Sequence, residues 1–179
     1  MNKFSHTSAG LKSLCYELCV NIHGNFHRAA TIFGPRWDKP IYEDFSFHFE
    51  PTIKVKTLEV AIHHRSLDDL LGDCQSRTAV EAWNAEEPCG KLIGSSGSIL
   101  PLRECSNKVI HADSFEYQYG SYQTKDFETN QTYVNSVEES ELILVGRHGK
   151  KEWKVALDIL LYAENVYQYA HYAEQEFGI

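Results

Sequence analysis

The segment LRECSNKVIHADS, residues 102–114, carries the helical signal on which the fold prediction depends. On a helix that turns about 100° per residue, the apolar residues Leu102 and Val109 fall on one side together with Cys105. Residues 103, 107, 111 and 114 fall within about 80° of one another on the other side. The segment therefore predicts a helix, starting near Pro101 and running to about residue 115, that packs by one face and exposes the other.

Further helices are predicted on both sides of this segment. From residue 8 to about residue 33, apolar residues recur at steps of three and four, and Gly34-Pro35 ends the run. A second helix is predicted over residues 52–71, with Gly72 as its stop, and Asp158 is placed to cap a final helix. The chain is therefore predicted to be mainly α, a helical bundle.

The remaining segments are predicted to be irregular, apart from one hairpin. Residues 37–51 indicate a loop with a short strand or a turn packed over the core, and the polar stretch 74–98, with its Pro and Gly residues, indicates a flexible loop. Residues 116–140 indicate turns and short extended pieces. The segment 141–155 has the pattern strand, turn, strand, which predicts a small C-terminal β-hairpin. We expect a single domain over residues 1–179.

Composition limits the classes of function. The net charge of −8 opposes an extended electrostatic contact with a nucleic-acid backbone, so only a small basic site remains. The five Cys residues match neither a disulfide framework nor a zinc ligand set, which indicates free thiols in a reducing compartment. No apolar run has the length of a signal peptide or of a membrane span, so a cytoplasmic location without membrane contact is expected.

The polar face of the 102–114 helix suits chemistry on a phosphodiester. Arg103 can neutralise phosphoryl oxygens, His111 can transfer protons near neutral pH, and Asn107 can orient either group. RNA supplies a 2′-hydroxyl as an internal nucleophile, so neither a metal nor a cofactor is required. In the structural alternative, Arg103 pairs with Glu104 or acidic loops, Asn107 is solvated, and His111 donates to a backbone carbonyl.

A second group of residues is a candidate for contacts with RNA phosphates. The densest basic cluster of the chain lies at the tip of the predicted hairpin, and Lys108 lies on the 102–114 helix. The candidate RNA-binding residues are Lys108, Arg147, Lys150 and Lys151. Because hairpin tips are commonly charged, a solvated turn is the alternative interpretation.

The sequence Leu102-Arg-Glu-Cys-Ser-Asn-Lys-Val-Ile-His-Ala112 resembles the signature helix of HEPN-type proteins, in which an Arg and a polar residue precede a His. The resemblance implies a helical bundle, often dimeric. It implies either a metal-independent ribonuclease of a defence or toxin–antitoxin system, with a composite site across a dimer, or a noncatalytic dimeric protein-interaction module. The implied partners are a second copy, an RNA substrate, and a partner or antitoxin protein.

The sequence departs from the usual HEPN pattern at two points. Seven residues separate Arg103 from His111, whereas about four to six are usual. Ser106 stands where an Arg directly before the Asn would restore the common form. Either Arg103 substitutes from one turn earlier or catalysis has been lost.

Metal-dependent hydrolysis is a third, weaker class. His23 and His27 have the i, i+4 spacing of a helical metal pair, but no third ligand lies at a suggestive position nearby. The side chains of His63 and His64 diverge by about 100° on a helix, which favours surface or partly buried positions. Gly94-Ser-Ser-Gly97 lacks the Lys and the spacing of a phosphate-binding loop.

Overall fold

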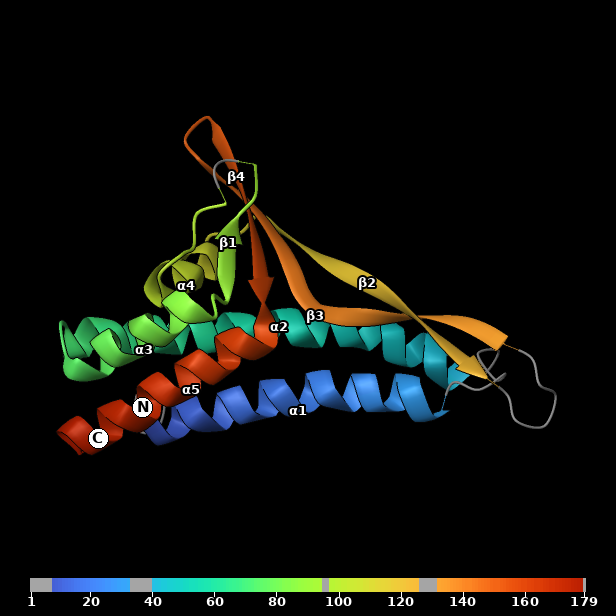
Figure 1. The fold of residues 1–179 in the computed structure, drawn as a ribbon, viewed down its shortest axis with the longest axis horizontal. Coiled ribbons are helices and arrows are strands. Elements are labelled where there is room, and N and C mark those ends of the chain that lie inside the picture. The colour runs from blue at the N-terminus through green and yellow to red at the C-terminus, as the bar shows by residue number, and fades with distance from the viewer. Residues whose placement is uncertain (1–7, 33–39, 95–96, 126–131, 179) are drawn as a thin grey trace.

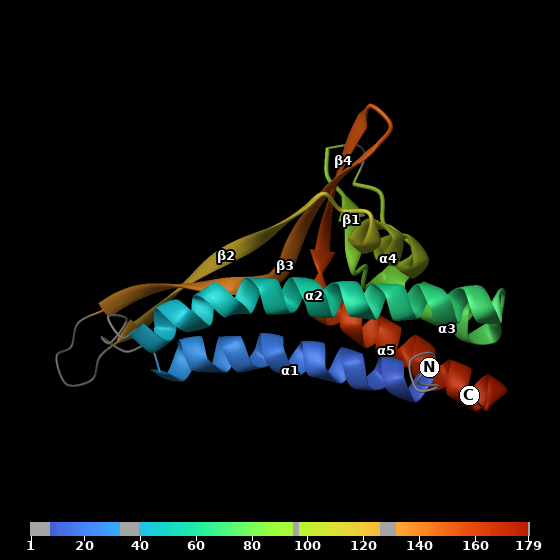
Figure 2. The same ribbon diagram turned by 180° about the vertical axis from the view of Figure 1, so that it is seen from behind.

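Three long helices form the base of the molecule (Figures 1 and 2). The computed structural model describes residues 8–32, 40–94, 97–125 and 132–178. Helices α1 (Ser8–Ile32) and α2 (Pro40–Leu71) run antiparallel to each other, and α5 (Ile159–Phe177) lies along α1. The first helix therefore packs against the last one, so that distant parts of the sequence share one core.

An antiparallel sheet of four strands stands on this helical base (Figure 1). Its order is β1-β4-β3-β2. The strands are β1 (Gly90–Leu92), β2 (Ser114–Lys125), β3 (Thr132–His148) and β4 (Lys151–Asp158). β2 and β3 form a long ribbon that reaches over α2, where the Tyr117 hydroxyl donates to the Glu50 carbonyl at 2.5 Å. The tip of the β3–β4 hairpin projects away from the helices.

Two shorter helices complete the helical part of the fold: α3 packs beside α5, and α4 packs against α2. α3 (Gln75–Glu86) and α4 (Leu102–Ile110) flank β1 in the sequence. The Glu81 carboxylate of α3 accepts hydrogen bonds from the Leu102 N–H at 2.9 and 3.1 Å, so that α3 satisfies a backbone donor in the first turn of α4. This contact fixes the start of α4 relative to α3.

The core draws residues from every helix and from the sheet. Leu18 of α1 and Ile53 of α2 are fully buried, and so are Leu144 and Leu157 of the sheet. Two tyrosines of α5, Tyr162 and Tyr169, are among the largest buried side chains. Because a buried Tyr needs a partner for its hydroxyl, these two residues place polar contacts inside an otherwise apolar core.

Several predicted elements are confirmed. The first helix is present over Ser8–Ile32, and the predicted hairpin is present as β3 and β4, with Gly149 in its turn at a positive φ of 61°. Asp158 caps α5, because its carboxylate accepts from the N–H groups of Leu160 and Leu161 at 3.0 and 3.1 Å.

The prediction of one small hairpin was wrong about the extent of the sheet. Residues 116–125 and 132–140, expected as turns and short extended pieces, belong to the two longest described strands, and residues 126–131 lie outside the described residues. Residues 74–98, expected as a flexible loop, contain α3 and β1 instead. The fold is therefore a mixed one in which helices predominate and a four-stranded sheet is an integral layer.

Helix α2 begins earlier than predicted. It starts at Pro40 and includes Pro51, although residues 37–51 were expected to form a loop with a short strand; residues 37–39 lie outside the described residues. A proline inside a helix removes one backbone hydrogen bond, but its fixed φ is compatible with helical geometry. Phe49 and Ile53 are buried on either side of Pro51, so core packing favours the helix there.

Candidate functional site

Helix α4 presents the two faces that its sequence predicts. Leu102, Cys105 and Val109 are buried, and the N-terminus is held by Glu81. Burial raises the pKa of the Glu81 carboxyl, while hydrogen bonds from the Leu102 and Arg103 N–H groups act in the opposite direction. The helix ends earlier than predicted, at Ile110 instead of about residue 115, so Ser114 lies in β2 and not on the helical face.

The Arg103 guanidinium is held by two carboxylates of α2. Its Nη1 donates to Asp68, which is 1% exposed, and its Nη2 donates to Asp69 at 2.5 Å. Asp68 also accepts from Nε of Arg77 at 2.7 Å and lies 3.7 Å from Nη1 of Arg65. Arg103 therefore belongs to an ion cluster that joins α2, α3 and α4. Arg103 therefore pairs with carboxylates, as the alternative to a catalytic role predicted. These carboxylates belong to α2, however, and not to Glu104 or to acidic loops.

Beside the ion cluster, a buried polar chain joins α2, α4 and α5. Nδ1 of His64 lies 2.7 Å from Oγ of Ser106, which lies 2.8 Å from the Tyr162 hydroxyl. Burial lowers the pKa of His64 to about 3, and the charges of Arg65, Arg103 and Arg77 act in the same direction. His64 is therefore a neutral core residue, and the prediction of a surface or partly buried position was wrong for it.

Arg103, Asn107 and His111 do not converge within one chain. The Asn107 amide donates to Glu104 at 2.8 Å, while the Arg103 guanidinium is directed to Asp68 and Asp69 of α2. His111 is exposed at the C-cap of α4. Eight residues of helical rise separate it from Arg103, which corresponds to about 12 Å along the axis.

The structure places His111 beside the β3–β4 hairpin. Two residues beyond His111, the Asp113 N–H donates to the Val145 carbonyl at 2.8 Å. The Asp113 carboxylate accepts from Nε of Arg147 at 3.2 Å, and both side chains are more than half exposed. Helix α4 thus runs directly into the sheet, and its exposed end lies next to the basic strand.

A second contact connects α4 with the hairpin through an aromatic ring. Nζ of Lys108 lies 4.3 Å from the centroid of the Trp153 ring, within the range of a cation–π interaction. Trp153 pairs with Gly146 in the sheet, where a Cβ atom would lie 2.2 Å from the indole. Gly146 therefore leaves the space that the Trp153 ring occupies.

The predicted phosphate contacts lie, together with His111, around the junction of α4 and the β3–β4 hairpin. Lys108 and Arg147 lie next to the end of α4 through the contacts just described, and Lys150 and Lys151 are exposed at the adjoining turn. We define the α4–hairpin site as His111, Lys108, Arg147, Lys150 and Lys151. Arg103 and Asn107 lie outside it.

Sequence reasoning missed Asp68, the centre of the ion cluster. A signal was present, because Asp68 follows the buried residues Val60 and His64 at steps of four on α2. A carboxylate on the buried stripe of a helix needs cationic partners. The sequence does not show which arginines supply them.

Other candidate ligands do not form a metal centre within the described ranges, where no group of three or more His, Cys, Asp or Glu is suitably placed. His23 is exposed, and the side chain of His27 lies outside the described residues. No described helix combines the length and the apolar character that crossing a membrane requires. Comparison with known proteins gives no match to a family model, a curated protein or a solved structure.

Proposed function

We propose that this chain is a HEPN-like ribonuclease of a cytoplasmic defence or toxin–antitoxin system, which cleaves RNA at the α4–hairpin site without a metal. The observation that carries the proposal is the exposed position of His111, three residues after Lys108 on α4 and two residues before Asp113, whose carboxylate accepts from Arg147. An imidazole beside cationic side chains suits a phosphodiester, because charge neutralisation and proton transfer are both needed there.

In the proposed reaction, His111 accepts the proton of a 2′-hydroxyl as its oxygen attacks the adjacent phosphorus. Lys108 and Arg147 stabilise the negative charge of the pentacoordinate phosphate. The 5′-oxygen leaves with a proton supplied by a protonated His111, either of the same chain or of a second copy. The products are a 2′,3′-cyclic phosphate and a 5′-hydroxyl.

This proposal changes the role of Arg103. Its guanidinium binds Asp69 and the buried Asp68, whereas Arg147 pairs with a carboxylate, Asp113, that is more than half exposed, so Arg103 is the less available of the two to a phosphate. We assign to Arg103 the task of holding α4 against α2 and leave phosphate contacts to the α4–hairpin site. A homodimer that brings two such sites together is part of the proposal, and light scattering on the same sample measures its mass.

The test is cleavage of labelled total RNA in the presence of a chelator. We expect wild type to cleave and His111→Ala to lose about 100-fold or more of the rate, as is typical for loss of an acid–base group. His23→Ala is the matched control, because His23 is an exposed histidine on α1. Unchanged cleavage by His111→Ala, with both proteins folded, would contradict the mechanism.

The second candidate function is a noncatalytic dimeric interaction module. The pairing of Arg103 with two carboxylates favours it, since that arrangement leaves the signature helix with a structural role. If concentrated wild-type protein forms a dimer and leaves RNA intact, this candidate replaces the ribonuclease.

A further inference from the structure

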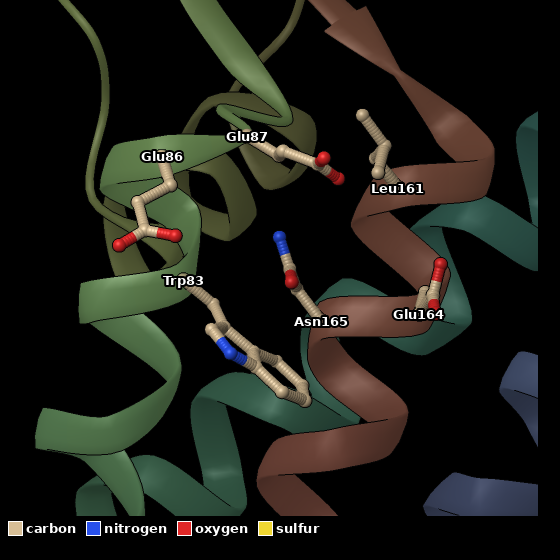
Figure 3. A pocket seen from close by; sticks show the side chains of 6 residues that line it. All are labelled: Trp83, Glu86, Glu87, Leu161, Glu164 and Asn165. Atoms are coloured by element: carbon tan, nitrogen blue, oxygen red, sulfur yellow. The ribbon is translucent and has the colours of Figure 1, made fainter.

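A pocket opens between α3 and α5, on elements that the α4–hairpin site does not use. Its volume is about 420 Å³, within the range of about 300–1,000 Å³ typical of ligand pockets. Residues from the end of α3 face residues from the first turns of α5 across it (Figure 3). The lining residues are Trp83, Glu86, Glu87, Leu161, Glu164 and Asn165.

The charge of this pocket has one sign. Glu86 and Glu87 line it from the α3 side and Glu164 from α5, and all three are exposed. No Lys or Arg appears among the described lining residues. Because like charges close together are unfavourable, a cation that entered the pocket would be attracted by three carboxylates and would reduce their mutual repulsion.

Asn165 provides a separate indication of a ligand. Its side chain is 6% exposed, and its Nδ2 atom is buried without a hydrogen-bond partner. Figure 3 shows the Asn165 amide pointing into the pocket, with its nitrogen on the side of Glu87. Buried polar groups in folded proteins are almost always paired, so this donor calls for an acceptor supplied from the pocket.

Trp83 gives the pocket a flat aromatic wall. Its indole is 46% exposed and lies below Asn165 in Figure 3. Planar cations, guanidinium above all, stack favourably on indole rings. The pocket therefore combines three features: carboxylates for a positive charge, an aromatic surface for a planar group, and one donor for a neutral or negative oxygen.

We propose that this pocket binds an arginine side chain presented by a peptide segment of a partner protein, with a peptide carbonyl accepting from Asn165. A polyamine carries positive charge but no acceptor, so it would leave the Asn165 amide unpaired. Free arginine carries an acceptor, but its carboxylate would meet the three glutamates. A peptide bond supplies the acceptor without the negative charge, which is why a peptide fits better than either small molecule.

The experiment titrates the full chain with N-acetyl-arginine-N-methylamide at constant ionic strength and follows the side-chain NMR signals of Trp83 and Asn165. We expect saturable shifts in the millimolar range and none with the uncharged citrulline analogue. Trp83→Leu is expected to weaken binding about two- to fivefold, as for an exposed cation–π contact. The double variant Glu87→Gln/Glu164→Gln is expected to weaken it about 3- to 20-fold.

The matched control is Glu116→Gln/Glu152→Gln, which removes the same charge from exposed sheet positions and should leave the affinity unchanged. All four substituted glutamates are exposed, so the variants should fold, and circular dichroism checks this. Equal binding of the citrulline analogue, or no shift with the capped arginine, would overturn the proposal. Tighter binding of spermidine or free arginine than of the capped arginine would overturn the assignment to a peptide.

Discussion

Nδ1 of His64 and Oγ of Ser106 are 2.7 Å apart inside the bundle, where neither side chain is more than 2% exposed. Ser106 directly precedes Asn107, at the position where an arginine would restore the common HEPN pattern. That position faces the core and not the surface. An arginine there would lie beside His64, whose pKa is already lowered by the charges of three arginines. The buried position of residue 106 therefore disfavours an arginine there.

The variant Ser106→Arg is expected to lose about 4 kcal/mol or more of the free energy of unfolding, because it buries an unpaired charge. Urea denaturation followed by circular dichroism measures this loss. Ser13→Arg, at an exposed position on α1, is the control and should change stability little. A Ser106→Arg protein as stable as wild type would mean that position 106 can reach water.

Acidification is expected to destabilise the protein through His64. Its pKa in the folded protein, about 3, is below the unfolded value of about 6.5, so the unfolded chain binds more protons between these values. Stability contributed by neutral His64 is complete above pH 6.5 and falls as the pH falls, by up to about 1.4 kcal/mol per pH unit. Urea midpoints from pH 6.5 to 5 should therefore fall more steeply for wild type than for His64→Asn. Equal slopes would contradict the buried, neutral state.

The variant Asp68→Asn is expected to lower the free energy of unfolding by about 3 kcal/mol, since it leaves three arginines without their shared carboxylate. The loss should lie at the low end for buried pairs, because the arginine side chains reach water. Asp73→Asn is the control: its fully exposed carboxylate pairs with the same Arg77. If both variants unfold at the wild-type urea concentration, the ion cluster does not stabilise the fold.

The variant Gly146→Ala is expected to displace the Trp153 ring, because its new Cβ would lie 2.2 Å from the indole. A loss of about 1–3 kcal/mol is expected, as for overpacking elsewhere. Gly24→Ala is expected to raise the free energy of unfolding instead. Gly24 lies in α1 with nothing within 4 Å of an added Cβ, and alanine favours helices over glycine by up to about 1 kcal/mol. Thermal unfolding of wild type, Gly146→Ala and Gly24→Ala measures both changes. A stabilised Gly146→Ala protein would contradict the close approach of the Trp153 ring to Gly146.

RNA affinity is expected to depend on salt through the α4–hairpin site. Replacing Lys108 or Arg147 with Ala should reduce the slope of log affinity against log salt by about 0.7 for each phosphate of single-stranded RNA that the variant no longer neutralises. Lys12→Ala is the control, because Lys12 pairs with Glu174 where α1 packs on α5. Fluorescence anisotropy with a labelled oligonucleotide measures the slopes. Identical slopes for wild type, Lys108→Ala and Arg147→Ala would place RNA elsewhere.

The sequence predicts the helices better than the sheet, for a physical reason. A helical stripe such as that of α1 is a local pattern, whereas β1 pairs with β4 between Gly90 and Leu157, far apart in the chain. Aromatic and polar residues do alternate over residues 114–119, a period-two pattern that favours a strand, but β2 is an outer strand paired on one side in the described sheet. Nothing local indicates which segment such a strand will join.

The candidate site was predictable in part. The helical wheel correctly placed Leu102 and Val109 on the buried face of α4, but it could not show that Arg103 meets Asp68, 35 residues away. It also continued the helix past Ile110, where the Asp113 N–H pairs with Val145 and the chain enters the sheet. The helical pattern of the sequence continues beyond Ile110, but the helix stops there because the following residues pair with β3, which is far away in the sequence.

The packing of α1 against α5, together with the place of β4 inside the sheet, governs when the protein can mature during its synthesis. The first helix emerges from the ribosome with an apolar surface that α2 can cover in part, whereas the part that packs on α5 waits for a partner about 150 positions later in the chain. Until residues 151–177 have emerged, the core stays open and exposes surface that chaperones bind. If the protein cuts RNA, the ribosome that makes it is therefore shielded from that activity until translation has passed the last helix.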